Sequence, residues 1–327
     1  MRRAIWAALA VACSLALSGC GLQASSAYVP QPGPGSLQKV PGAEGTSITV
    51  TGKNFTEQLI MSKIAALTAR ASGFRVKDLS DVPGSVPVRQ LMLTGGADIT
   101  FDYTGTAWLT YLGHQKGIPD PQKQWQAVHD ADLKNGLTWG KPSRENNTYA
   151  LAIRQSSKAK LGGITKLSQL KDLPVKERTF CVEDEFYSRQ DGFKPMLKKY
   201  GLTFGAKGKD GVPRGNVAIM DTGAVYSATA HGACNFGEVF TTDGRIKALH
   251  LLVLQDDKHF FPSYASAPVF GTAVAKKYPQ LVKNFAAVTA KWNNALFQRL
   301  NAKVDLDGED PASVAFDWMR SEGFITG

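Results

Sequence analysis

Two short turns carry the side chains in this sequence that are best suited to bind a small charged molecule. Residues Asp102-Tyr103-Thr104-Gly105-Thr106 follow an apolar stretch ending at Phe101, which puts Tyr103 and Thr106 at the end of a predicted strand. Residues 52–58 follow an earlier strand and place Lys53 beside a helix start. A helix N-terminus attracts anions, because its free N–H groups point outward. Each turn alone also has an ordinary explanation, a packed aromatic ring or a solvated lysine beside a capped helix.

The sequence lacks the residue patterns of common catalytic sites. Its five histidines are scattered, and neither a Gly-x-Ser-x-Gly turn nor a His-Glu-x-x-His helix occurs. Asp256 and Asp257 are adjacent carboxylates, but neighbouring residues of a strand point to opposite faces. We therefore expect a binding protein that needs no cofactor and no metal, with a secreted enzyme as the distant alternative.

The order of the predicted elements indicates an α/β fold, and the roughly 280 residues that follow residue 45 suit two lobes. Strands are expected at residues 47–51, 74–79 and 97–101, with helices between them, the first capped by Asn54 and Glu57 as a capping box. This order favours a mostly parallel sheet covered on both faces. The pattern repeats after Thr148, with strands at 149–153, 179–183, 235–240, 248–254 and 265–274 and helices at 167–170, 192–200 and 221–231. Two tail helices follow, at about 279–300 and after Asp310.

The N-terminal segment has the layout of an export signal. A positive start, Met1-Arg2-Arg3, precedes an apolar stretch at residues 4–17 that is too short to span a bilayer comfortably. Leu17-Ser18-Gly19-Cys20 then resembles the lipobox of bacterial lipoproteins. We expect residues 1–19 to be a signal peptide and Cys20 to carry a lipid; a plain signal peptide is the alternative. Residues 20–45 are rich in Pro, Gly and Ser, which predicts a flexible tether from an extracytoplasmic body to the cell membrane.

The distribution of charge and the number of cysteines further limit the class of protein that this sequence can encode. The chain carries a net charge of +10, but its Lys and Arg residues are spread along the sequence and form no run interleaved with aromatic residues. We therefore expect no nucleic-acid partner and a solvated surface that tolerates an anionic membrane or cell wall. Cys181 and Cys234 form an even pair in an exported chain, which predicts a disulfide, with two buried free thiols as the alternative. Neither cysteine has the spacing of a zinc site.

Six motifs in order carry a resemblance to a known family. They are Lys53-Asn54-Phe55-Thr56-Glu57-Gln58, Asp102-Tyr103-Thr104-Gly105-Thr106, Asn147-Thr148-Tyr149-Ala150-Leu151-Ala152, Ser188-Arg189-Gln190-Asp191-Gly192, Thr241-Thr242-Asp243-Gly244-Arg245-Ile246, and Asp256-Asp257-Lys258 through Pro262-Ser263-Tyr264. From about residue 47 to 325 the chain resembles the glycine betaine/carnitine/choline/proline-binding proteins of osmoprotectant ABC importers.

The resemblance implies a fold, a site and partners. The fold is the two-lobe periplasmic-binding-protein type (type II), with residues 46–148 plus 265–327 in lobe 1, residues 149–264 in lobe 2 and a ligand cleft between them. A cage of rings would hold a trimethylammonium head, and basic and hydroxyl groups would hold a carboxylate. Carried over by position, the cage is Tyr103, Tyr149, Phe240 and Tyr264, and the carboxylate partners are Lys53, Thr106 and Arg189. The protein would act as a monomer that delivers its ligand to the permease subunits of an ABC transporter.

The ligand stays open among quaternary ammonium compounds. Ring faces suit this group, because it has no N–H to donate and is bound through the ring quadrupoles. Phe240 stands where relatives usually have Tyr, which leaves the exact ligand in doubt. A glycine betaine-like molecule is the first expectation, and choline, carnitine, proline betaine and a histidine betaine are the alternatives. We rank choline lower, because without a carboxylate it would leave Arg189 and Lys53 unpaired.

Overall fold

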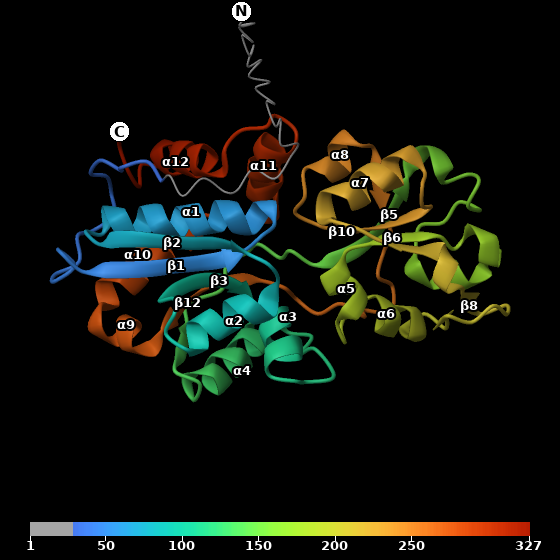
Figure 1. The fold of residues 1–327 in the computed structure, drawn as a ribbon, viewed down its shortest axis with the longest axis horizontal. Helices are drawn as coiled ribbons and strands as arrows, with labels where there is room; N and C mark the ends of the chain where they lie inside the picture. The colour runs from blue at the N-terminus through green and yellow to red at the C-terminus, as the bar shows by residue number, and fades with distance from the viewer. Residues whose placement is uncertain (1–28) are drawn as a thin grey trace, which may run out of the picture.

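The computed structural model describes residues 29–327, which form two α/β lobes side by side (Figure 1). Each lobe is built on its own five-stranded sheet. The prediction of a two-lobe α/β fold is confirmed. The predicted signal peptide and Cys20 lie outside the described residues.

Lobe 1 contains a mixed sheet in the order β2-β1-β3-β12-β4. Its strands are β1 (Ser47–Lys53), β2 (Arg75–Val82), β3 (Ile99–Tyr103), β4 (Leu137–Trp139) and β12 (Ser266–Gly271). β1 pairs in parallel with β2 and β3, whereas β12 returns antiparallel between β3 and β4. The parallel strands end at the same edge, so Lys53 and Tyr103 come to the same side of the lobe.

Helices cover both faces of this sheet (Figure 1). On one face lie α1 (Thr56–Ala71), α11 (Asn294–Asp305) and α12 (Pro311–Ser321), and on the other α2 (Ser85–Leu93), α4 (Pro121–Leu133) and α9 (Thr272–Lys277). α10 (Pro279–Thr289) packs against α1 and β12, while α3 (Thr104–Thr106) and a π-helical turn at Ala107–Tyr111 follow β3. α1 buries Ile60, Ile64 and Leu67 at helical spacing, as expected.

Lobe 2 has the strand order β11-β5-β10-β6-β9. Its strands are β5 (Tyr149–Arg154), β6 (Phe180–Val182), β9 (Val217–Ile219), β10 (Phe236–Phe240) and β11 (Leu251–Val253), with a separate ribbon of β7 (Thr203–Phe204) and β8 (Gly211–Val212). The helices are α5 (Asp184–Ser188), α6 (Phe193–Lys199), α7 (Thr222–His231) and α8 (Arg245–Ala248), with 3-10 turns at Gln155–Ser157, Leu167–Asp172, Val175–Glu177 and Arg214–Asn216. β5 is antiparallel to β10, whereas β6 is parallel to β10 and β9.

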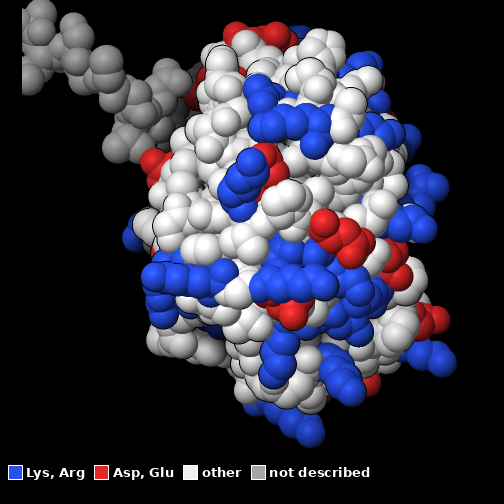
Figure 2. All heavy atoms as spheres, turned by 90° about the vertical axis from the view of Figure 1, so that its right-hand side faces the viewer, with Lys and Arg blue, Asp and Glu red and all other residues white. Residues whose placement is uncertain are grey.

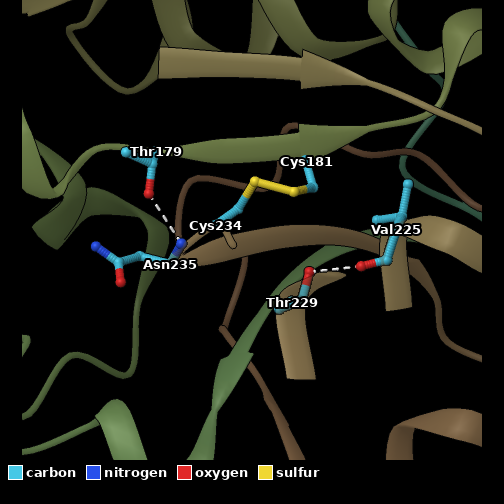
Figure 3. The surroundings of a disulfide bond; sticks show 6 residues. All are labelled: Thr179, Cys181, Val225, Thr229, Cys234 and Asn235. Carbon is cyan, nitrogen blue, oxygen red and sulfur yellow. Dashed lines mark hydrogen bonds between the residues drawn. A yellow bond between two sulfur atoms is a disulfide. The ribbon is translucent and has the colours of Figure 1, made fainter. Parts of the chain in front are cut away.

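The predicted disulfide is present in lobe 2 (Figure 3). Cys181 lies in β6, and Cys234 stands two residues before β10, the parallel neighbour of β6. The two Cα atoms are 5.7 Å apart, a normal separation for a disulfide. The next residue, Asn235, donates its backbone N–H to the hydroxyl of Thr179 at 2.9 Å, which ties the same two segments together again.

The chain crosses between the lobes in two segments that touch each other. Asn146 and Ala265 form an antiparallel bridge, and the backbone N–H of Tyr264 donates to the side chain of Asn146 at 2.7 Å. These crossing segments bring Asn147, Tyr149 and Tyr264 to the boundary between the lobes.

Three local expectations were wrong. Asn54 does not cap α1, because Phe55 is the N-cap residue. The carboxylate of Glu57 accepts hydrogen bonds from side chains of other elements instead of from the helix N-terminus. The long tail helix is interrupted, because Asn293 caps α11 with its own side chain. Residues 29–45, assigned to the tether, lie against lobe 1, where Val29, Leu37, Val40 and Ala43 are buried. By contrast, Asp310 caps α12 as predicted.

Within residues 29–327, no helix combines the length and the apolar character that crossing a bilayer requires.

Candidate functional site

A cleft of about 830 Å³ lies between the lobes and is lined by residues of both. All seven residues that the sequence analysis selected line this cleft: Lys53, Tyr103, Thr106, Tyr149, Arg189, Phe240 and Tyr264. Lys53 and Tyr103 come from the strand ends of lobe 1, whereas Arg189 and Phe240 come from lobe 2. The fold thus brings together residues that are far apart in the sequence.

Aromatic rings form a continuous wall of the cleft. The ring of Phe240 lies 5.3 Å from Tyr149 and 5.3 Å from Phe55, measured between ring centroids. Phe55 in turn stacks on Tyr103 at 6.3 Å, and Tyr149 meets Tyr264 edge-on at 5.6 Å. The sequence analysis did not select Phe55, although it stands in the same motif as Lys53. Its place directly before a helix, two residues after Lys53, was the signal that could have found it.

A buried carboxylate orients Tyr103. The Tyr103 hydroxyl donates to Glu57 Oε1 at 2.7 Å, and Asn147 Nδ2 donates to the same oxygen at 2.8 Å. Asn301 of α11 reaches the other oxygen at 3.3 Å. Burial, together with the charges of Glu57 and Glu145, raises the pKa of Tyr103 well above its ordinary value, so its hydroxyl stays protonated as a donor. The ring of Tyr103 is therefore held in one orientation by a residue that the sequence analysis had assigned to a helix cap.

Lys53 is buried and already has an anionic partner. Its ammonium lies 2.8 Å from Asp102 Oδ1 and 5.0 Å from the centroid of the Tyr103 ring. Tyr111 donates its hydroxyl to the second oxygen of Asp102 at 2.7 Å. The lysine therefore presents a fixed positive charge beside the ring wall, and its position is set by Asp102.

Arg189 joins several parts of the site. Its Nε donates to Asp191 Oδ1 at 2.7 Å and its NH2 to Asp191 Oδ2 at 2.5 Å, a two-pronged contact. Its NH1 lies 2.8 Å from Glu185, and NH2 reaches Thr106 Oγ1 of lobe 1 at 3.4 Å. Tyr264 donates its hydroxyl to Asp191 at 2.6 Å, so the same carboxylate also fixes this ring.

These ion pairs invalidate the argument by which the sequence analysis ranked choline below the betaines. Choline was ranked lower because it would leave Arg189 and Lys53 without a negative partner. In the structure Asp191 and Glu185 pair with Arg189, and Asp102 pairs with Lys53. A ligand without a carboxylate would therefore leave neither Lys53 nor Arg189 unpaired. Binding measurements must decide whether choline or a betaine binds more tightly.

Glu185 joins the two lobes directly. Its carboxylate accepts the hydroxyl of Ser85 at 2.6 Å and the Ser85 backbone N–H at 3.1 Å, both at the N-terminus of α2 in lobe 1. Burial alone would raise the pKa of Glu185, but the charges of Lys53 and Arg189, with the Ser85 bond, hold it below its usual range. Glu185 is thus an ionised bridge between α2 and the Arg189 cluster.

A second contact between the lobes involves Asp305 of α11. Its carboxylate accepts the Thr56 hydroxyl at 2.6 Å and lies 3.4 Å from Arg245 of lobe 2, which also pairs with Asp243. Burial raises the pKa of Asp305 to about 6, because it outweighs the attraction of Arg245. Since this exceeds the usual value of 3.8, the folded protein binds the proton more tightly than the unfolded chain does. The ionised carboxylate therefore lowers stability above about pH 6, and this loss disappears as the pH falls towards about 4.

We expect Asp305→Asn to raise the free energy of unfolding by about 1–3 kcal/mol at about pH 7.5, because the amide keeps an acceptor for Thr56 without the buried charge. The difference from the wild type should shrink at about pH 4.5. Urea unfolding of both proteins at the two pH values measures it. An equal difference at both values, or a variant that is less stable at the higher pH, would contradict the assignment.

Among the described residues, no group of three or more His, Cys, Asp or Glu side chains is arranged to hold a metal ion. The cleft instead combines rings, hydroxyls and internally paired charges, which suits a small organic ion bound without covalent chemistry.

Two α/β lobes connected by crossing segments around such a cleft define a type II periplasmic binding protein. The chain belongs to the OpuAC family, the substrate-binding domain of ABC-type glycine betaine transport systems, whose model matches residues 46–321. It is 35% identical over 291 residues to a glycine-betaine-binding protein of Pseudomonas aeruginosa, covering 86% of this chain and 90% of the relative.

Two further comparisons place it among transport proteins. It is 30% identical to the ergothioneine transport permease/ergothioneine binding protein EgtU of Helicobacter pylori, over 86% of this chain and 48% of that longer protein. A solved structure described as a glycine betaine/carnitine/choline ABC transporter superposes with a TM-score of 0.68 at 26% identity, covering 85% of this chain and 99% of that one.

Proposed function

We propose that this protein captures a quaternary ammonium osmolyte of the glycine betaine type in the cleft and delivers it to an ABC permease. The observation that carries the proposal is the wall of five rings, Phe55, Tyr103, Tyr149, Phe240 and Tyr264, beside the buried cations Lys53 and Arg189. Family membership and the glycine-betaine-binding relative support it.

The chemistry of the ligand matches this arrangement. A trimethylammonium group is bound by ring faces, at roughly 0.5–2 kcal/mol for each desolvated ring. A carboxylate at the other end would accept from Thr106, Lys53 or Arg189, whose donor groups converge on the cleft from both lobes. Ligand binding would therefore favour closure of the lobes, since only the closed form completes both parts of the site.

A bulkier betaine is the second candidate. The cleft measures about 830 Å³, which is large for a molecule as small as glycine betaine. Phe240 offers a ring face without a hydroxyl, and a relative at 30% identity is described as an ergothioneine binding protein. Both features favour including a histidine betaine among the tested ligands.

Family membership places the protein outside the cytoplasm, as expected for an ABC substrate-binding protein. We further propose that it is held at the membrane by a lipid on Cys20, on the basis of the sequence Leu17-Ser18-Gly19-Cys20, and that it works as a monomer. Its action is binding and release, without a chemical step.

Isothermal titration calorimetry on residues 29–327 tests the proposed function. Glycine betaine, choline, carnitine, proline and ergothioneine are titrated in turn into the wild type and Tyr149→Ala. We expect one-to-one binding of at least one quaternary ammonium compound, weakened about 10-fold or more by Tyr149→Ala, because a ring of the cage is lost. Tyr187→Ala is the matched control, since this ring packs on Phe193 and Phe204 away from the cleft. No heat with any quaternary ammonium compound, on folded protein, would overturn the proposal.

The bond between Ser85 and Glu185 should contribute to affinity by stabilising the closed form. We expect Ser85→Ala to raise the Kd about 5- to 30-fold through faster dissociation, because it removes a charge-assisted bond between the lobes. Stopped-flow fluorescence measures both rates. Ser188→Ala is the control, because its hydroxyl donates within α5, to the backbone oxygen of Glu185. A dissociation rate equal to that of the wild type would show that this contact does not support closure.

A further inference from the structure

A dense group of cationic side chains lies at the end of lobe 2, on the surface formed by α6, the β7–β8 ribbon and an adjoining loop. We call it the outer basic patch and define it by seven exposed residues: Lys194, Lys198, Lys199, Lys207, Lys209, Arg214 and Lys258. Figure 2 faces this end of the molecule and shows Lys and Arg atoms gathered over it. Residues 193–216 hold six of the seven and only one acidic residue, Asp210.

The contacts within the patch show that its members share one surface. Lys194 and Arg214 both lie over the ring of Phe204, at 5.6 and 5.1 Å from its centroid. Lys258 donates to the backbone oxygen of Lys199 at 3.4 Å, although 59 residues separate them. The sequence analysis described the charge as spread along the chain and missed that six of these residues fall within residues 193–216; folding adds Lys258 to them.

The patch is open to a partner. Within residues 29–327, none of its seven side chains forms an ion pair with a carboxylate. Seven neighbouring positive charges repel one another, and an anionic surface relieves that repulsion. The patch therefore favours association with an extended array of negative charge.

The surroundings indicate what kind of array fits. Lys194 lies over the rings of Tyr187 and Phe204, 4.1 and 5.6 Å from their centroids, so the ring faces turned to the patch are occupied by a cation and are not open to a stacking base. The large exposed apolar side chains of the described chain are Val86, Leu93, Leu133, Ile219 and Leu306, and none of them belongs to the patch. The patch thus suits a planar anionic surface that it contacts through charge alone, with no apolar side chain inserted into that surface.

We propose that the outer basic patch docks this protein on the anionic phospholipid headgroups of the membrane at which it works. Polybasic surfaces bind such bilayers through the sum of many weak attractions, which need no groove. An extracytoplasmic receptor that must find a membrane permease gains from this contact, because it confines the search to the membrane surface. The proposal does not depend on which ligand occupies the cleft.

Vesicle co-sedimentation of residues 29–327, which contain both lobe cores but not Cys20, tests it. We expect binding to vesicles in which about one lipid in three is phosphatidylglycerol and none to pure phosphatidylcholine vesicles. The bound fraction should fall about 10-fold or more between about 50 and 300 mM NaCl, because salt screens exposed charges. Equal binding to both vesicle types, or to neither, would overturn the proposal.

Two triple variants, each with three fewer positive charges, distinguish binding through the patch from binding through the net charge of the protein. Lys198→Gln, Lys199→Gln and Lys207→Gln remove patch charges, whereas Lys276→Gln, Lys277→Gln and Lys283→Gln remove exposed charges of α9 and α10 in lobe 1. We expect the first set to weaken vesicle binding about 10-fold or more and the second about 2-fold or less. Equal losses would mean that net charge alone drives binding, and tighter binding to duplex DNA than to vesicles would favour nucleic acid instead; either result overturns the proposal. Unfolding midpoints and ligand titrations should be unchanged in both sets, which keeps this test separate from that of the cleft.

Discussion

Replacing Arg189 by alanine is expected to weaken ligand binding about 100-fold or more, the largest effect of any single cleft residue. The guanidinium is buried and connects the proposed cage to the opposite lobe: it holds Asp191, which fixes Tyr264, it lies beside Glu185, and it reaches Thr106. Its loss removes a donor for a ligand carboxylate and leaves the buried Asp191 and the partly buried Glu185 without their cationic partner.

Stability should fall along with affinity. Breaking a buried ion pair by removing one member costs about 3–5 kcal/mol, because the remaining charge stays desolvated. We therefore expect Arg189→Ala to unfold at lower urea concentration. Arg189→Lys should recover part of the stability but little of the affinity, since an ammonium group cannot reproduce the two-pronged contact with Asp191.

Calorimetry and urea unfolding on the same samples separate the two effects. Arg214→Ala is the control, because this arginine is exposed and lies over Phe204 outside the cleft. Retention of wild-type affinity within about 3-fold in Arg189→Ala would show that the guanidinium is structural and that the ligand is held by the rings alone.

Loss of the Cys181–Cys234 disulfide is expected to lower the free energy of unfolding of lobe 2 by about 4 kcal/mol, a loss comparable to that expected for Arg189→Ala. The bridge closes a loop between residues 53 positions apart, which restricts the unfolded chain. Cys181→Ala with Cys234→Ala should show this loss while the ligand stoichiometry stays at one, because both cysteines are buried in the core of lobe 2 and neither lines the cleft.

Urea unfolding with and without a reductant checks the disulfide directly. The wild type should lose stability when reduced, whereas the double variant, which has no bond to break, should not respond to the reductant. An unchanged wild-type midpoint, with both thiols shown to be free by titration, would contradict a stabilising role.

The sequence alone determined a large part of this protein. The strand and helix order of residues 47–103, the cap of α12 at Asp310 and the pairing of Cys181 with Cys234 followed from local patterns, and the structure agrees with them. Helix α4 and strand β4 of the same lobe were not predicted. Such features depend on residues that are near in the chain or on a simple pairing rule. The motifs also indicated the family, and all seven selected residues line one cleft.

Only the tertiary structure decided how these residues are paired. Glu57 accepts a hydrogen bond from Tyr103 and does not cap a helix. Folding also brings Asn147 and Asn301, which are 90 and 244 residues away in the sequence, within hydrogen-bonding distance of its carboxylate. The same holds for the partners of Lys53 and Arg189 and for the bridge from Glu185 to Ser85. Of the outer basic patch, folding adds only Lys258, since the other six residues are near one another in the sequence. Hydrogen bonds and charge interactions act over a few ångströms of space, and the sequence does not show which distant residues become neighbours at that range.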